Sequence, residues 1–383
     1  MTWLLMLLGT ACLMLAAHPF VTYPLSLRLF KRHAPRARPQ PLAAHSAPSF
    51  AICMCAYNEE RVIEQKITNL LQLREREPQL QILVYVDAST DRTAEILRRY
   101  QSVIDLHVAG ERHGKTHGMN LLSARARADV LVFTDANVML DLQCLEDLRA
   151  HFADPAVGCV CGNLTYVNAH DSVTAASGSL YWRFEEALKR LESQSGSMMG
   201  ADGSIFAVRR SLRYAPPDHI IDDMYVSLMV LVAGYRVIQA RDVKAYEESV
   251  TSAREEFGRK VRIACQAFNV HRLVWPKLRR LDALTRYKYV SHKFLRWLSI
   301  YFLAAAAVAY VLALIVAGRP GLAAGAMALA SLGVVLGTRW SIKPFAQIVD
   351  LLTALAGAGV GVWRSMRGER FQTWQPASSI RKG

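Results

Sequence analysis

Residues 50–60, FAICMCAYNEE, decide the fold, because a short apolar run gives way at once to polar residues. These polar residues open a segment of helical period at 60–73, and the same alternation recurs along the chain. Further apolar runs lie at 81–86, 103–107, 130–134 and 157–161, with helical patterns at 90–100 and 142–152. This alternation predicts an α/β domain with a Rossmann-like, mostly parallel sheet, helices on both of its faces, and ligands at the carboxyl ends of its strands.

The charge of the chain points to an anionic surface. The formal net charge of the 383 residues is +14, and 52% of them are hydrophobic. Basic residues cluster beside apolar segments, at 28–38 and at 279–296, a placement that favours a membrane surface over nucleic acid. We therefore expect no nucleic-acid partner. The 7 cysteines show no CxxC spacing, which predicts a reducing compartment and no structural zinc.

Apolar and basic patterns divide the chain into segments. They are an N-terminal transmembrane anchor at 1–30, a basic, proline-rich linker at 31–49, the α/β domain at 50–250, amphipathic juxtamembrane helices at 251–296, a transmembrane helical hairpin at 297–337, and an interfacial or re-entrant helix with a basic cytosolic tail at 338–383. A cleaved signal peptide is the alternative for the first segment, but positive charge follows its apolar run instead of preceding it. The positive flanks predict a multi-pass protein of the cell membrane with a cytosolic α/β domain.

Polar residues follow two of the apolar runs, where a parallel sheet binds its ligands. They are Ala56, Tyr57 and Glu59 after the first run, and Asp87 and Asp91 after the second. Carboxylates, hydroxyls and free backbone N–H groups at such strand ends can hold a nucleotide. Capping of the following helix is the alternative for Asn58 and Glu59, and an N-capped helix that starts near Thr90 explains Asp91 equally well.

A glycine-flexed loop at 110–116, GERHGKT, carries a lysine suited to a diphosphate. The loop is similar to a phosphate-binding P-loop, but three residues separate its glycines where a P-loop has four. We therefore reject a P-loop and retain Lys115 as a diphosphate ligand, with Asn120 one helical turn later.

The run at 130–134 ends in Asp135-Ala136-Asn137, which places two side-chain oxygens just past a buried strand. Oxygens at i and i+2 can lie on one side of a turn, as a hard cation between two phosphates requires. Capping is the alternative, and metal binding is favoured only by the neighbouring motifs.

The order and spacing of these motifs resemble the second glycosyltransferase family, with its GT-A fold, and the membrane-bound branch that includes hyaluronan and cellulose synthases. The resemblance covers residues 50–296. It implies that the segment at 56–59 and Asp87 hold the nucleoside, that Lys115 meets the diphosphate, and that an Asp-x-Asp motif binds Mg²⁺ or Mn²⁺ with the donor. This chain has Asn137 in place of the second Asp. Its neutral amide leaves less negative charge at the metal site. We therefore expect Asn137→Asp to preserve or strengthen metal dependence.

The resemblance extends to three later motifs. Asp202 and Gly203 lie in the expected donor-sugar loop, and Asp222 and Asp223 take the place of a Glu-Asp motif whose Asp is the general base. Two adjacent carboxylates before an apolar helix can also be simple caps, and the position after the sugar loop favours catalysis by Asp223. Arg262 stands where processive members carry Gln-x-x-Arg-Trp. Its implied role is to pair with the leaving diphosphate, although the Gln and the Trp of that motif are absent.

Together these features predict a metal-dependent, inverting hexosyltransferase. The resemblance implies a nucleotide-sugar donor of the UDP-sugar type, and the acceptor would be a lipid-linked saccharide or polysaccharide at the bilayer, with other polysaccharide-assembly proteins as partners. The alternatives are a processive polysaccharide synthase, a nucleotidyltransferase, and a membrane scaffold with an inactive transferase domain.

Overall fold

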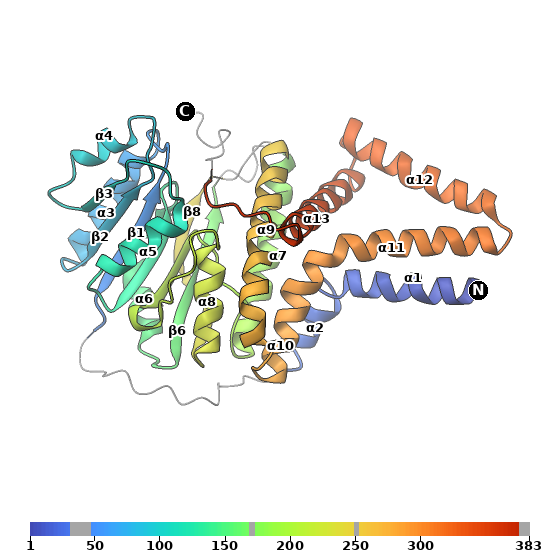
Figure 1. Ribbon diagram of the computed structural model, residues 1–383, viewed down its shortest axis with the longest axis horizontal. Coiled ribbons are helices and arrows are strands. Elements are labelled where there is room, and N and C mark those ends of the chain that lie inside the picture. The colour runs from blue at the N-terminus through green and yellow to red at the C-terminus, as the bar shows by residue number, and fades with distance from the viewer. Residues whose placement is uncertain (31–46, 168–172, 249–252, 375–383) are drawn as a thin grey trace. The chain divides into compact units, whose positions relative to one another are not determined.

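The computed structural model describes residues 1–30, 47–167, 173–248 and 253–374 (Figure 1). The chain forms two compact units. The α/β unit comprises Phe30–Ser252, Asn269–Asp282 and Arg370–Gly383, and the helical unit comprises Met1–Leu29, Ala253–Phe268 and Ala283–Glu369.

The α/β unit is built on an eight-stranded sheet with the order β3-β2-β1-β4-β7-β6-β8-β5. Its strands are β1 (Phe50–Ala56), β2 (Gln81–Val86), β3 (Asp105–Val108), β4 (Val130–Asp135), β5 (Met139–Leu140), β6 (Val157–Tyr166), β7 (Ile205–Arg209) and β8 (Arg236–Glu247). The first four strands are parallel to one another. β1 is buried along its whole length, as expected of a central strand covered on both faces.

Helices cover both faces of this sheet (Figure 1). They are α3 (Ile63–Arg76), α4 (Thr93–Arg98), α5 (Lys115–Arg125), α6 (Cys144–Phe152), α7 (Val173–Gln194) and α8 (Asp222–Val232), with a short 3-10 turn at Arg210–Leu212. α3 places Ile63, Ile67 and Leu70 on one face, at helical spacing, in the core with Ile52 of β1. α5 packs on the opposite face, because a Cβ at Gly118 would lie 2.6 Å from Cys55 Sγ. The predicted α/β class with a mostly parallel sheet is confirmed.

The sheet also contains antiparallel pairs that the apolar runs did not indicate. β7 runs antiparallel to both β4 and β6, and β5 runs antiparallel to β8. β7 is apolar over residues 205–208 but lies within the segment interpreted as a sugar loop, and β5 has only two residues, so neither is predicted as a strand. β8 pairs in parallel with β6 as far as Tyr166 and Glu247, and thereby brings a distant segment to the edge where β4 ends.

The helical unit contains α1 (Thr2–Ala17), α2 (Thr22–Leu27), the first part of α9 (Ala253–Leu278), α10 (Ala283–Tyr289), a π-helical turn (Val290–Phe294), α11 (Leu295–Val316), α12 (Pro320–Arg339) and α13 (Phe345–Met366). Of the segments described, three are long and apolar enough to cross a membrane: Ala283–Val316, Pro320–Arg339 and Phe345–Met366. The second part of α9 belongs to the α/β unit.

Within this unit, α1 packs along α11. The hydroxyl groups of Thr10 and Tyr310 lie 2.9 Å apart, and Gly9 faces the ring of Tyr310. α13 is fastened to α11 by the Tyr301 hydroxyl, which donates to the carbonyl of Gly359 at 2.7 Å.

The N-terminal segment differs from the single span predicted for residues 1–30. α1 has 16 residues and ends at Ala17, and a turn separates it from α2. At 1.5 Å per residue such a helix is about 24 Å long, shorter than a hydrocarbon layer of about 30 Å. The apolar segment predicted as one anchor is therefore divided between two helices. The break follows His18 and Pro19, and anchoring by this segment stays a prediction.

The C-terminal apolar segment forms one unbroken helix, although polar residues interrupt its apolar sequence. α13 is continuous over 22 residues although it contains Gln347 and Asp350. Its length permits a span, and the interfacial or re-entrant placement stays a prediction.

Candidate active site

The carboxylate of Asp87 organises the loop that follows β3. Asp87 is fully buried at the end of β2. Its Oδ1 accepts the backbone N–H groups of His113 (2.8 Å) and Gly114 (3.0 Å), and its Oδ2 pairs with Arg112 Nε at 3.3 Å. Three donors on one buried carboxylate fix the loop against the strand end. Asp87, predicted to hold the nucleoside, thus directs its carboxylate to the backbone that carries Lys115.

Tyr57, another predicted nucleoside ligand, is covered on its ring face. The guanidinium of Arg112 lies 3.5 Å from the ring centroid of Tyr57, a cation–π contact. Arg112 Nη2 also donates to the carbonyl of Trp374 at 2.6 Å, and the Trp374 ring meets Tyr57 edge-on at 6.0 Å. Residues from the start, the middle and the end of the chain therefore meet at this strand end, within the α/β unit.

Gly114 allows the C-terminal residues to lie against the loop. Its φ is +93°, and a Cβ there would lie 2.1 Å from the carbonyl oxygen of Gln372. Gln372 Nε2 donates in turn to the carbonyl of His113 at 3.0 Å. A side chain at position 114 would be strained in backbone conformation and would displace the C-terminal residues.

Four of the predicted donor ligands make hydrogen bonds within the α/β unit. Asp91 accepts the N–H of Thr93 at 3.0 Å, the capping role weighed for it, and Glu59 donates its backbone N–H to Thr93 Oγ1 at 2.8 Å. Asn120 Nδ2 donates to the carbonyl of Pro216 at 2.8 Å, and its Oδ1 accepts from Arg213 Nη1 at 2.7 Å. Asn120 therefore ties α5 to the segment before α8. Ala56, at the end of β1, contributes its carbonyl to the Asp87 N–H at 3.0 Å.

The ends of β4 and of the glycine loop meet through an ion pair. Lys115, the first residue of α5, places Nζ 2.5 Å from Oδ1 of Asp135, the last residue of β4. Burial disfavours charge on Lys115, but the carboxylates of Asp135 and Asp222 outweigh it and raise the lysine pKa above its usual value. A permanently charged ammonium is thus held at the strand ends, as recognition of a diphosphate requires.

Gly203 and Asp223 complete this charged centre. A Cβ at Gly203 would lie 2.9 Å from Asp223 Oδ2 and 3.2 Å from Lys115 Nζ. The predicted sugar loop, the predicted base and the predicted diphosphate ligand therefore converge, although the sequence separates them widely. Because Gly203 has no side chain, the space beside Asp223 and Lys115 stays open.

Asp222 and Asp223 open α8 side by side, with different surroundings. Asp222 is 2% exposed, and its Oδ2 is buried with no hydrogen-bond partner among the residues described. Burial and then the charge of Asp222 raise the pKa of Asp223 to about 7. Asp223 Oδ1 also accepts the N–H of Met224 at 2.5 Å, one of the N–H groups in the first turn of α8 that lack a partner within the helix. A carboxyl group with a pKa near neutrality is suited to proton transfer.

Asp202, the other residue of the sugar loop, faces a different group. Its carboxylate pairs with the buried Lys189 of α7, which also lies 2.5 Å from Glu186 Oε1. Burial raises the pKa of Glu186 to about 7. This network fixes the loop to α7, so Asp202 has a bonded partner within the protein.

Hydrogen bonds from α3 hold the turn that carries Asp135 and Asn137. Lys66 of α3 is fully buried, and its Nζ donates to Thr134 Oγ1 at 3.3 Å and to the carbonyl of Val138. Burial lowers the pKa of Lys66 to about 7. Both ends of the turn are therefore attached to one helix.

The residues at this turn fit a hard divalent cation. Asn137 Nδ2 donates to Glu247 Oε1 at 2.9 Å, which directs the amide oxygen away from Glu247. Among the described residues, no group of three or more His, Cys, Asp and Glu side chains is placed to hold a metal. Mg²⁺ and Mn²⁺ need no such group, because one or two protein oxygens suffice where substrate phosphates and water supply the other ligands. Asp135 and Asn137 are such a pair.

Arg262 lies in the helical unit, on α9, where its Nη1 donates to Gln266 Oε1 at 3.4 Å. Its predicted contact with a diphosphate stays a prediction.

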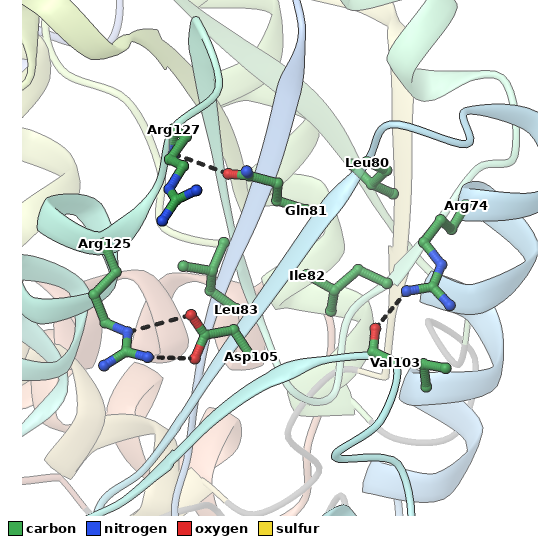
Figure 2. A pocket seen from close by; sticks show the side chains of 9 residues that line it. All are labelled: Arg74, Leu80, Gln81, Ile82, Leu83, Val103, Asp105, Arg125 and Arg127. Atoms are coloured by element: carbon green, nitrogen blue, oxygen red, sulfur yellow. Dashed lines mark hydrogen bonds and ion pairs between the residues drawn. The ribbon is translucent and has the colours of Figure 1, made fainter.

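A pocket of about 490 Å³ lies at the opposite ends of β2 and β3 (Figure 2). It is lined by Arg74, Leu80, Gln81, Ile82, Leu83, Val103, Asp105, Arg125 and Arg127. Figure 2 shows that its polar groups face one another: Arg125 pairs with Asp105 at 2.8 Å, and Gln81 accepts the N–H of Arg127. Because these partners lie at the amino ends of the strands, we place the donor site at the other edge.

Three residues of the site were not among those predicted. Arg112 was part of the quoted glycine loop, but only the structure shows that it stacks on Tyr57. Glu247 and Trp374 reach the site from the end of β8 and from the C-terminal residues. Neither stands in a motif, so the sequence carries no local signal for them.

Part of the chain is similar to known proteins. Residues 51–214 match the model of the family "Glycosyl transferase family 2". The chain is 25% identical over 194 residues to the poly-beta-1,6-N-acetyl-D-glucosamine synthase of Staphylococcus aureus, which covers 48% of this chain and 46% of that protein. It is also 25% identical over 224 residues to the O-antigen chain rhamnosyltransferase WbaN of Salmonella anatum, covering 55% and 70% of the two chains.

The fold is similar to that of a mannosyltransferase from Pyrobaculum calidifontis, solved in complex with GDP-Man and Mn²⁺. The TM-score is 0.71 at 22% identity, over 95% of this chain and 99% of the other. The matched region spans about half the length of that synthase. Residues 51–214 therefore resemble glycosyl transferase family 2, the fold is GT-A-like, and long apolar helices follow the matched segment in the chain.

Proposed function

We propose that the protein transfers a sugar from a nucleoside diphosphate sugar to a lipid-linked or polysaccharide acceptor at a membrane, with inversion at the anomeric carbon. The observation that carries the proposal is the convergence of Lys115, Asp223 and Gly203: one methyl group at Gly203 would touch both charged side chains. A cation for the diphosphate and a base for the acceptor thus flank a backbone position with no side chain. That is the arrangement that a single in-line displacement requires.

Each side chain has one task in this reaction. Asp223 takes the proton from the acceptor hydroxyl as its oxygen attacks the anomeric carbon, and the bond to the diphosphate breaks on the opposite side. Lys115 neutralises the charge that builds on the leaving diphosphate. Asp135 and Asn137 would hold a divalent cation, which when bound supplies further positive charge to that group. Asp222 keeps the pKa of Asp223 high enough for proton transfer near neutrality.

The acceptor class follows from the helices. Three candidate membrane spans occur among the residues described, and the basic clusters flank them. A catalytic domain on such helices meets acceptors at the bilayer, a lipid-linked saccharide or a growing polysaccharide. We propose that the apolar helices lie in the cell membrane and that the α/β unit lies in the cytosol, because positive flanks of membrane spans favour the cytosolic side. The mannosyltransferase of similar fold was solved with GDP-Man, a nucleotide sugar, which supports the donor class and leaves UDP or GDP to experiment.

A donor screen tests the proposal. Full-length protein in detergent is incubated with Mn²⁺ and a panel of UDP- and GDP-sugars, with and without a lipid extract, and release of the nucleoside diphosphate is measured. We expect release with one donor class, stimulated by the extract, and none from Asp223→Asn. Formation of UTP or GTP from the donor when pyrophosphate is added would instead indicate a nucleotidyltransferase, because that reaction run in reverse consumes pyrophosphate. The absence of both nucleotide binding and turnover would favour an inactive scaffold. Long products that stay bound to the enzyme between successive additions would favour a processive synthase.

A further inference from the structure

The charge of the metal-binding turn is the starting point. Asp135 supplies one carboxylate and Asn137 a neutral amide, so the turn holds one negative charge fewer than two acids would provide. The structure places a second carboxylate beside the amide, because Glu247 Oε1 accepts from Asn137 Nδ2 at 2.9 Å.

Glu247 is held at this position by the sheet. It is the last residue of β8, and it pairs with Tyr166 of β6. The preceding residue, Tyr246, pairs with Met139 of β5, only two residues beyond Asn137. The backbone carbonyl of Glu247 also accepts the N–H of Val167 at 3.0 Å. Strand pairing on both sides therefore fixes where its side chain begins, next to the turn after β4.

We propose that Glu247 is a positioning residue of the metal and donor site, which orients the Asn137 amide and supplies the second negative charge near the bound cation. The inference rests on the proposed function. Because Nδ2 is committed to Glu247, the amide oxygen is left to coordinate a cation. The electric field of a nearby carboxylate strengthens that oxygen as a ligand, as outer partners of metal ligands commonly do.

The arrangement changes the expectation for Asn137→Asp. Judged by charge alone, a second acid at position 137 should bind metal more tightly. In the structure, that acid would face the carboxylate of Glu247 at hydrogen-bond distance, with no proton between them. Two like charges at this separation repel, and one of the groups must move or take up a proton. The single variant should therefore gain little or lose affinity, and Glu247→Gln should rescue it, since a glutamine amide can donate to the new aspartate.

A charge-exchange series tests this without turnover. Mn²⁺ is titrated into the full-length protein in the presence of UDP and, separately, GDP, and free Mn²⁺ is read by electron paramagnetic resonance. The variants are Glu247→Gln, Asn137→Asp and the two together. Glu248→Gln serves as the matched control, because Glu248 is the exposed neighbour in the chain. Thermal unfolding of each variant reports on stability.

The expected result is a loss of Mn²⁺ affinity of about 10- to 100-fold in Glu247→Gln, the usual effect of removing an outer partner of a metal ligand. Glu248→Gln should bind Mn²⁺ with the affinity of the wild type. The double variant should recover most of the Mn²⁺ affinity that Glu247→Gln loses. If Glu247→Gln binds Mn²⁺ like the wild type and only its melting temperature falls, the contact is a structural tie and the inference is wrong. If Asn137→Asp alone binds more tightly than the double variant, the repulsion argument also fails.

Failure of the proposed function gives a different pattern. In that case the wild type binds no Mn²⁺ with either nucleotide, and Asp135→Ala changes nothing, which overturns both conclusions. Loss of binding in Asp135→Ala together with wild-type binding in Glu247→Gln overturns only the role of Glu247.

Discussion

Lys115 Nζ lies 2.5 Å from Asp135 Oδ1, and this contact joins the glycine loop to the end of β4. The loop end that carries Lys115 is fixed by two backbone N–H groups on the buried Asp87. The ammonium is therefore placed by a strand end and a buried carboxylate, with little freedom of its own. A preorganised cation of this kind stabilises charge without having to rearrange during the reaction.

The first prediction concerns this pair. Lys115→Met should weaken binding of UDP or GDP by about 10- to 100-fold, the usual value of a charge-assisted hydrogen bond. Asp135→Ala should abolish metal-dependent binding of the donor. Calorimetry with Mn²⁺ measures both, and Lys244→Met, at an exposed lysine, is the control. Nucleotide affinity that is unchanged in Lys115→Met would show that the diphosphate lies elsewhere.

A methyl group at Gly203 provides the second prediction. In Gly203→Ala the new Cβ would lie 2.9 Å from Asp223 Oδ2, closer than packed side chains allow, so the carboxylate must move. Turnover should fall by about 10-fold or more, since small displacements of a reacting group are costly. Stability should change little, because a side-chain end can shift.

Gly110→Ala is the matched control for that variant, because a Cβ at Gly110 meets nothing within 4 Å. The comparison is made on kcat and melting temperature together. Equal turnover in both variants would contradict the placement of Asp223 beside Gly203.

The central strands could be predicted from the sequence because they are buried on both faces. Such strands, β1 among them, show as continuous apolar runs, and their polar followers mark the binding edge. β8 could not be found in this way. Its buried residues at 237–240 include Gln239, and the exposed charged residues Arg241, Asp242 and Lys244 interrupt the rest of the strand.

The site was predictable in its residue types but not in its pairings. Lys115, Asp135, Gly203 and Asp223 were expected from motif order, and the structure brings them together. Glu247 was not expected, because its contact with Asn137 joins positions 110 residues apart. Such contacts depend on strand pairing, which no local pattern records. Asp87 was likewise predicted as a residue of the site, but its hydrogen-bond partners, His113 and Gly114, lie on another loop and were not predicted.

The third prediction follows from the pKa of Asp223, which burial and the charge of Asp222 raise to about 7. A general base must be ionised, so the transfer rate should rise with pH and level off above about 7. Asp222→Asn removes the neighbouring charge and lowers the pKa of Asp223. The rise of the transfer rate should therefore occur at lower pH in this variant. A pH–rate profile of both proteins measures the shift, and coincident profiles would exclude Asp223 as the titrating group.

Asp223→Asn separates catalysis from capping. As a helix cap, Asn is nearly equal to Asp, so stability should change by well under ~1 kcal/mol near pH 4. The raised pKa means that the folded state binds this proton more tightly than the unfolded state does. The stabilising contribution is therefore present below the unfolded pKa and is lost as pH rises through about 7, so Asp223→Asn should be the more stable protein at pH 8. Its turnover should fall by at least ~10²-fold while nucleotide binding is retained.

The last prediction concerns the side of the membrane on which the α/β unit lies. If α11 and α12 form a transmembrane hairpin, the turn between them at Arg319 lies outside and the α/β unit lies in the cytosol. Cysteines placed at Arg319 and at Arg98, an exposed residue of α4, report on the two sides. The seven native cysteines are all buried, so they should contribute little background. In intact cells an impermeant maleimide should label Arg319→Cys and leave Arg98→Cys unlabelled, and lysis should expose both. Labelling of Arg98→Cys in intact cells would place the catalytic domain outside, where nucleotide sugars are not supplied, and the proposed topology would have to be reversed.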